Sequence, residues 1–144
     1  MDESAGILGV HHIGMVVHDI AAVGEIYCRR YGYEPRTPII HDRTQTAFVQ
    51  FFRLPGDQVY LELVAPDSDR SKVARALSEG GGLNHICYVA SDIDAACRRL
   101  RAQQMILLQA PVAAEAFPGR RIAWLMGRDK IPIELVERGG PDEL

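Results

Sequence analysis

The sequence predicts an α+β fold, in which two tandem βαβββ modules form a curved sheet around a cleft. The main reason is an internal repeat. The segments Val10–Ile20 and Leu83–Ile93 align without a gap, and this alignment places His12 on His85 at an offset of 73 positions. A period of about half the chain length indicates a duplicated supersecondary unit.

The second observation is that both repeats end in the same way. Leu61–Val64 closes the first repeat and Ile133–Val136 closes the second, and each segment has a glutamate, Glu62 or Glu134, at its second position. Each module therefore has a matching histidine near its start, His12 or His85, and a matching glutamate near its end.

The first module is predicted to span about residues 7–66. Its opening strand is rich in Ile, Val and Met. Asp19 is placed to cap the following helix, because its carboxylate can accept backbone N–H bonds of the first turn. Gly32 is placed to end that helix. The expected elements are a strand at 7–17, a helix at 20–30, a short extended piece at 33–37, a loop at 38–44, and strands at 47–54 and 59–64.

A linker helix at about 68–80 follows, ended by the glycine run Gly80–Gly82. The second module, at about 82–138, repeats the element order of the first. Ser91 or Asp92 is expected to cap its helix. Its strands are expected at 83–90, 106–109, 120–126 and 130–137, so that residues 1–144 form one domain.

Composition narrows the class of protein. The chain has 144 residues, 47% hydrophobic and 24% charged, as in an ordinary globular domain. Its net charge of -3 gives no reason to expect nucleic acid or a membrane surface as a partner. The acidic start lacks the pattern of a signal peptide, and no apolar run reaches membrane-spanning length. With three cysteines and no CxxC spacing, free thiols and a cytoplasmic location are expected.

The repeated histidines and glutamates point to chemistry. A strand histidine between apolar neighbours needs partners for its ring nitrogens, and a buried carboxylate is more costly still. One such pair would mean little, but two at matching positions need a common cause. A divalent cation held by His12, Glu62, His85 and Glu134 would compensate both carboxylates. These ligands admit Co, Ni, Mn, Zn or Fe.

The remaining histidines do not share this pattern. His11 is expected to face away from His12 by strand alternation, and His18 and His41 lie at a strand end and in a loop. Surface positions are predicted for all three. Four aromatic side chains are candidates to line the cleft, although a core position is favoured for most of them: Phe48, Phe51, Phe52 and Trp124.

The motifs resemble the vicinal oxygen chelate superfamily, which includes the glyoxalases, from about residue 8 to 137. Within it they are most similar to methylmalonyl-CoA epimerases. The segments that carry the resemblance are His11–Gly14, His18–Ile20, Leu61–Pro66, Ser71–Ala74, Gly81–Cys87 and Ile133–Glu137.

The resemblance implies that His12, Glu62, His85 and Glu134 are metal ligands. It also implies a small-molecule substrate, such as an acyl-CoA or another thioester, and a homodimer. Superfamily members bind two substrate oxygens at the cation, which stabilises negative charge beside a carbonyl while a carboxylate moves the proton.

Two features depart from the epimerase pattern. An additional catalytic glutamate of those enzymes aligns with Val49 or Gln50, and neither side chain can act as a base. The loop Met126–Lys130 is shorter than its epimerase counterpart. Glu62 and Glu134 are therefore the candidate catalytic groups.

Three functions remain open at this point. The first is a metal-dependent isomerase or epimerase that is similar to methylmalonyl-CoA epimerase. The second is a lactoylglutathione lyase similar to glyoxalase I. The third is a superfamily member that binds a small molecule or modifies a natural product without epimerase activity.

Overall fold

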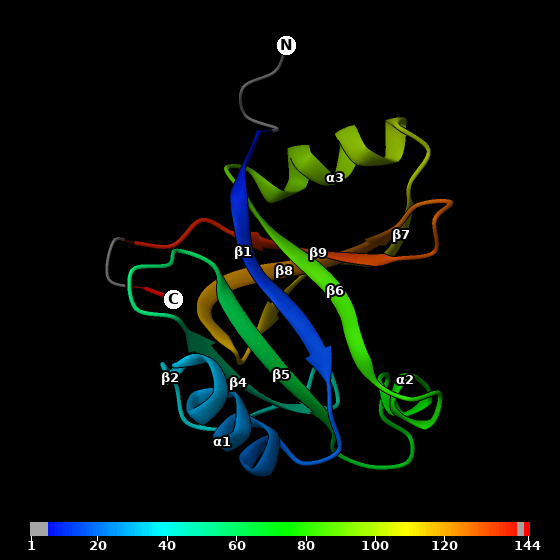
Figure 1. Ribbon diagram of the computed structural model, residues 1–144. Helices are drawn as coiled ribbons and strands as arrows, with labels where there is room; N and C mark the ends of the chain where they lie inside the picture. Colours follow the sequence, from blue (N-terminus) through cyan, green and yellow to red (C-terminus); the bar gives the residue numbers. More distant parts are fainter. Residues whose placement is uncertain (1–5, 141–142) are drawn as a thin grey trace. The chain divides into compact units, whose positions relative to one another are not determined.

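The computed structural model describes residues 6–140 and 143–144 (Figure 1). Most of the acidic start of the sequence, residues 1–5, lies outside this range. The chain divides into two compact units. The His12 unit is His12–Asn84, and the His85 unit combines the chain up to His11 with His85–Leu144.

The His12 unit contains two helices and most of the first five strands of the chain. Its strand order is β2-β4-β5-β1, with β3 paired to β4, and β1 runs parallel to β5. The elements are β1 (Ile7–Val16, whose first residues belong to the other unit), α1 (Ile20–Tyr31), β2 (Glu34–Pro35), β3 (Ile40–Asp42), β4 (Ala47–Arg53), β5 (Tyr60–Pro66) and α2 (Ala74–Ser78).

The His85 unit repeats this plan. Its strand order is β6-β9-β8-β7, and β6 runs parallel to β9. The elements are β6 (Gly82–Ala90, which begins in the other unit), α3 (Ile93–Ala102), β7 (Ile106–Ala114), β8 (Phe117–Met126) and β9 (Pro132–Glu137). The predicted α+β class and the duplicated module are confirmed. The cleft between the modules and the single domain stay predictions.

The predicted helix boundaries are confirmed by their caps. The Ala22 N–H donates to Asp19 Oδ1 at 3.0 Å, and the Ala95 N–H donates to Asp92 Oδ1 at the same distance. Gly32 has φ 84° and ends α1 in the left-handed region, where glycine carries no Cβ penalty. Both helices therefore begin by the same local mechanism, 73 positions apart.

The clearest differences from the sequence prediction are in β3, α2 and β7. The short strand β3 lies within the segment 38–44, which was predicted as a loop. The linker helix is shorter than expected, because α2 begins only at Ala74 and residues 67–73 form turns. Strand β7 continues through Pro111 to Ala114, which is possible because β7 is the last strand in the order of its sheet. An edge strand can accommodate a residue without an N–H donor.

All nine strands that the structure describes belong to one sheet, and in each unit the strands bury one face under the helix of that unit. In the His12 unit, α1 covers a core of Val17, Ile20, Phe52, Leu61, Leu63 and Ala65. In the His85 unit, α3 covers Ala90, Ala123, Leu125 and Leu135 together with its own Ile93, Ala96 and Cys97. Side chains alternate along a strand, so Glu62 and Glu134 lie on the faces of β5 and β9 opposite to these cores.

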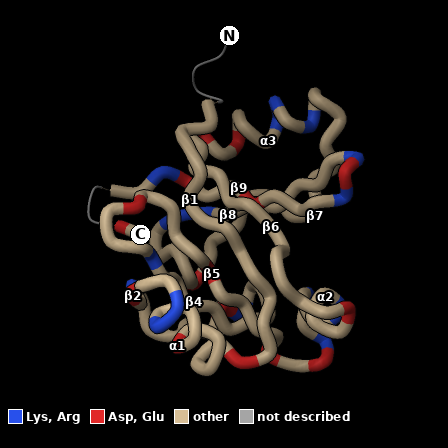
Figure 2. The backbone as a smooth tube through the Cα atoms, in the orientation of Figure 1, with Lys and Arg blue, Asp and Glu red and all other residues tan. Residues whose placement is uncertain are grey.

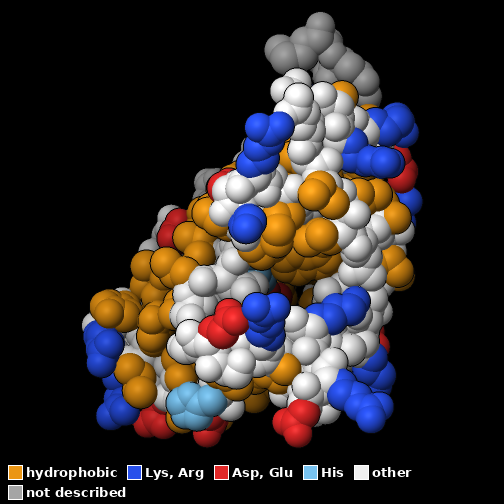
Figure 3. Space-filling model, turned by 90° about the vertical axis from the view of Figure 1, so that its right-hand side faces the viewer, with side chains coloured by type: hydrophobic (Ala, Val, Ile, Leu, Met, Phe, Trp, Pro, Cys, Tyr) orange, Lys and Arg blue, Asp and Glu red, His pale blue; other side chains and the backbone are white. Residues whose placement is uncertain are grey.

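Charge and exposed apolar side chains lie outside these cores. Strands β1 and β6 carry no charged residue, whereas the helices and loops do (Figure 2). Hydrophobic side chains also reach the surface between charged ones (Figure 3), and the most exposed large one is Leu83 at 79%. The homodimer stays a prediction. Among the described residues, the helices are too short and too polar to cross a membrane.

The tight packing of α1 on its sheet can be tested at Gly24. A Cβ at this position would lie 2.7 Å from Phe52 Cζ, and Phe52 is only 2% exposed. We expect Gly24→Ala to lower the free energy of unfolding by about 1–3 kcal/mol, because overpacking outweighs the better helix propensity of alanine. Urea denaturation measures this change.

The matched control is the same substitution in a Phe52→Leu background. Leucine lacks the ring atom that meets the new methyl group, so Gly24→Ala should cost much less there. An equal cost in both backgrounds would contradict the packing explanation.

Candidate functional site

The His12 unit brings one predicted ligand pair together through strand register. Gly14 of β1 lies opposite Glu62 of β5, and His12 lies opposite Tyr60. His12 and Gly14 point to the same face of β1, so the imidazole is a diagonal neighbour of the carboxylate. His12 Nε2 lies 3.3 Å from Glu62 Oε1. Both residues are buried, with exposures of 0% and 6%.

The His85 unit builds the second pair in the same way. Cys87 of β6 lies opposite Glu134 of β9, and His85 precedes Cys87 by two positions. His85 Nε2 lies 3.6 Å from Glu134 Oε1, and both residues are buried. Each glutamate thus lies opposite a small residue, and these small residues, Gly14 and Cys87, are also 73 positions apart.

An aromatic ring supports the histidine in each unit. Phe51 of β4 lies opposite Glu62, and its ring centroid is 5.2 Å from that of His12 at an interplanar angle of 71°. Trp124 of β8 lies opposite Glu134 and meets His85 at 4.7 Å and 72°. Edge-to-face contacts of this kind restrict the orientation of both rings.

From the sequence, Phe51 and Trp124 were predicted only as two of four aromatic residues that could line the cleft. Their offset is again 73 positions, and this offset could have identified them as repeat partners. The other two candidates lie elsewhere. Phe52 belongs to the core beneath α1, and Phe48 is 37% exposed and packs against His41 at a centroid distance of 4.5 Å.

Each pair has the chemistry of a cation half-site. A buried carboxylate is stable only where positive charge or hydrogen-bond donors compensate its lost hydration. An imidazole nitrogen and a carboxylate oxygen are ligands that divalent transition metals accept. The structure therefore places His12 beside Glu62 and His85 beside Glu134. This is the arrangement that each pair would need in order to bind a cation through both of its residues.

Strand β4 carries no carboxylate on the face that it shares with Glu62. Its register places Val49 on this face and Gln50 on the other, where the Gln50 amide donates to the Thr37 carbonyl at 2.8 Å. The side chains on the shared face are Ala47, Val49, Phe51 and Arg53. Whatever the alignment with epimerases, this strand places no base beside Glu62.

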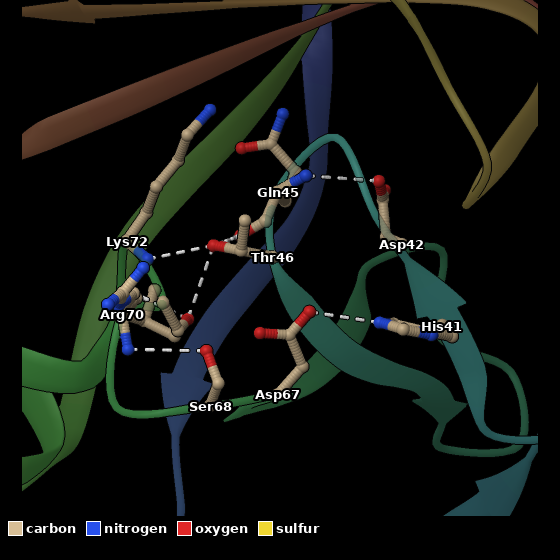
Figure 4. A network of polar contacts seen from close by, with 10 residues as sticks. His41, Asp42, Gln45, Thr46, Asp67, Ser68, Arg70 and Lys72 are labelled. Carbon is tan, nitrogen blue, oxygen red and sulfur yellow. Dashed lines mark hydrogen bonds and ion pairs between the residues drawn. The ribbon is translucent and has the colours of Figure 1, made fainter.

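A polar network holds the turn before β4 against the segment 67–72 (Figure 4). Thr46 Oγ1 accepts from the Lys72 backbone N–H at 2.8 Å, and Lys72 Nζ donates to the Thr44 carbonyl at 3.0 Å. His41 Nε2 lies 2.9 Å from Asp67 Oδ2. This network secures the start of β4, and with it the position of Phe51 along the strand.

The other three histidines, His11, His18 and His41, differ in how far they are exposed to solvent. The predicted surface position of His11 is wrong: it is 5% exposed, and its ring packs edge-on against Phe117 at 5.1 Å. The reason is that the second face of β1 is also covered at this position. His18 is exposed as predicted, and His41 is partly exposed beside Asp67.

Comparison with known proteins gives a consistent result. The family model described as the Glyoxalase/Bleomycin resistance protein/Dioxygenase superfamily matches residues 11–124. The chain is 24% identical over 133 residues to the Escherichia coli protein YaeR, covering 92% of this chain and 98% of that one. It is 32% identical over 94 residues to the ethylmalonyl-CoA/methylmalonyl-CoA epimerase of Cereibacter sphaeroides, covering 64% of this chain and 68% of the epimerase.

A solved structure shares the fold over nearly the whole chain. It is a Streptomyces coelicolor methylmalonyl-CoA epimerase variant in complex with 2-nitronate-propionyl-CoA. The TM-score is 0.82 at 26% identity, with 94% of this chain and 100% of that chain covered.

The aromatic support of His12 can be tested by comparing two neighbouring phenylalanines. Phe51→Leu removes the ring edge that orients His12, so we expect the affinity for a divalent cation to fall about 2- to 10-fold. Phe52→Leu alters the opposite face of β4 and should lower stability without changing this affinity. Titration with Co²⁺ or Zn²⁺ against a competing chelator measures both. Equal affinity losses in the two variants would contradict a specific role for Phe51.

Proposed function

Because the chain belongs to the Glyoxalase/Bleomycin resistance protein/Dioxygenase superfamily, we propose that it is a metal-dependent isomerase that moves a proton on the carbon beside a carbonyl group. The observation that carries this proposal is the buried histidine–glutamate pair present once in each unit. The match of the family model to residues 11–124 confirms the superfamily that was predicted from the repeated motifs.

The metal ligands in this proposal are His12, Glu62, His85 and Glu134, which hold one divalent cation together. Two carboxylates bring two negative charges into buried positions, and a divalent cation balances them. The oxygen and imidazole donors suit Co, Ni, Mn, Zn or Fe. Both units have a histidine–glutamate pair at the same repeat positions. This supports a single ion bound by both pairs, because both copies of the repeat have retained these residues.

Glu62 and Glu134 are the proposed proton carriers. The face of β4 beside Glu62 offers no other carboxylate. A bound cation supplies Lewis acidity, which lowers the cost of negative charge on the substrate oxygen. One glutamate takes the proton from the carbon acid, and return of a proton to the opposite face inverts that carbon.

The proposed substrate class is an acyl-CoA or related thioester. This is supported by the Cereibacter sphaeroides relative, which is named as an epimerase of ethylmalonyl-CoA and methylmalonyl-CoA. It is also supported by the shared fold with the Streptomyces coelicolor enzyme solved with 2-nitronate-propionyl-CoA. We propose a homodimer as the working assembly, since twofold dimers are the commonest soluble oligomers.

A second candidate is a lactoylglutathione lyase similar to glyoxalase I. The observation in its favour is the carboxylate-free face of β4, because in that chemistry the two glutamate ligands themselves move the proton. Both candidates use the same ligands, and they differ in whether the substrate is a thioester or a hemithioacetal.

The shared cation is tested by metal analysis of the purified protein. We expect one divalent cation per chain, and near-complete loss in His12→Ala and in Glu134→Gln, because each removes a ligand from a different unit. His41→Ala is the matched control, since His41 pairs with Asp67 and should leave the metal content unchanged. Retention of about half the metal in each ligand variant would indicate two separate sites. Full retention in both would refute the ligand assignment.

The reaction is tested with methylmalonyl-CoA and the metal-loaded protein in deuterated water. We expect deuterium at the α-carbon together with racemisation, because the exchanged proton passes through a glutamate. Glu134→Gln should slow exchange about 10²- to 10⁴-fold, because it removes a proposed metal ligand and a proposed proton carrier together. The surface substitution Glu25→Gln should leave the rate unchanged, because this side chain is 70% exposed.

Three outcomes separate the candidate functions. Exchange into methylmalonyl-CoA supports the epimerase. No exchange, combined with isomerisation of the methylglyoxal–glutathione hemithioacetal, supports the lyase instead. Tight binding of either compound with neither reaction would refute both enzymes and favour a binding protein.

A further inference from the structure

Trp124 and Phe51 are equivalent residues of the two units with different chemistry. Each lies directly opposite the glutamate of its unit, and each meets the histidine edge-to-face. The indole of Trp124 adds one polar atom, Nε1, to an otherwise repeated arrangement.

This atom is buried without a hydrogen-bond acceptor. Within residues 6–140 and 143–144, Trp124 Nε1 has no hydrogen-bond partner. Burial of an N–H donor without an acceptor is unfavourable, and such a group in a native structure calls for an explanation. Phe51 shows that a phenyl ring can make the same contact with histidine without this cost.

The chemistry of the indole restricts which group could accept a hydrogen bond from Trp124 Nε1–H. Nε1–H is a donor only, so its partner must offer a lone pair. It belongs to a ring that contacts His85 and that faces Glu134 across the strand ladder. Both residues are proposed metal ligands, so an oxygen of a bound substrate is the acceptor that this position fits.

We propose that Trp124 Nε1–H donates a hydrogen bond to a carbonyl or carboxylate oxygen of the bound substrate and so determines its orientation. This inference rests on the proposed function. Two equal His–Glu pairs offer a chelating substrate two equivalent orientations. The indole N–H of Trp124 has no counterpart in the phenyl ring of Phe51, so it makes the two orientations unequal, and the substrate oxygen then binds on the Trp124 side.

The test uses the single tryptophan of the chain. A ¹⁵N-labelled sample gives one indole N–H signal, and this signal reports on Trp124 alone. Titration of the cation-loaded protein with 2-nitronate-propionyl-CoA should move it downfield and slow its exchange with solvent. In calorimetry, Trp124→Phe should bind this compound about tenfold more weakly.

The variant keeps the ring that contacts His85, so its cation affinity and its resistance to urea should equal those of the wild-type protein. With methylmalonyl-CoA, KM should rise while kcat changes little, because the hydrogen bond is made in the ground state as well as in the transition state. A purely structural role would instead lower cation affinity and stability.

Two results would overturn the inference, and they are distinguishable. Binding of the nitronate with an unchanged indole signal and equal affinity in Trp124→Phe would overturn it and leave the proposed function intact. No binding to the cation-loaded wild-type protein would overturn the acyl-CoA function and this inference together. The indole measurement uses the wild-type protein, so it decides the question even if the variant folds poorly.

Discussion

The structure depends on the burial of one carboxylate in each unit. Glu62 lies between Leu61 and Leu63 on β5 and is only 6% exposed. A carboxylate removed from water must find positive charge or donors nearby, or the strand that carries it would not stay buried. One compensating group is the His12 imidazole, whose Nε2 lies 3.3 Å from Glu62 Oε1. The same relation holds between His85 and Glu134.

This requirement explains the strand register in both units. The first and last strands of each module run parallel, and a small residue lies opposite each glutamate: Gly14 in one unit and Cys87 in the other. A slip of one residue would turn the glutamate into the apolar core beneath α1 or α3 and expose the leucines that now fill it. Helix packing on one face and ligand pairing on the other therefore specify the same register.

The differences between the units matter as much as the repeat. Each unit has one buried histidine–glutamate pair with an aromatic ring beside it. One difference between the units is that the ring is a phenyl group at Phe51 and an indole at Trp124, and we propose that this difference determines the orientation of the substrate. The face of β4 beside Glu62 carries no carboxylate, so in the proposed reaction proton transfer falls to Glu62 and Glu134.

Much of the fold and the candidate ligands could be predicted from the sequence, because local signals repeat at a constant offset. Asp19 and Asp92 act on the helix turns beside them, and the alternation of apolar residues determines which face of a strand is buried. The repeat also identifies His12, Glu62, His85 and Glu134 as candidate ligands. Long-range pairing could not be predicted in this way: the strand β3, the shortened α2 and the extension of β7 through Pro111 depend on contacts with distant residues.

The repeat of His12 and Glu62 in His85 and Glu134 was thus determined by the sequence alone. Only the tertiary structure decided which side chains lie beside them. His11 is buried because the second face of β1 is covered at that point, and Gln50 points away from Glu62 because β4 pairs with β5 in one register. The contact between Trp124 and His85 likewise joins β8 to β6, which are not neighbours in the sheet. Such contacts depend on how strands assemble in space, and residue spacing by itself does not encode that assembly.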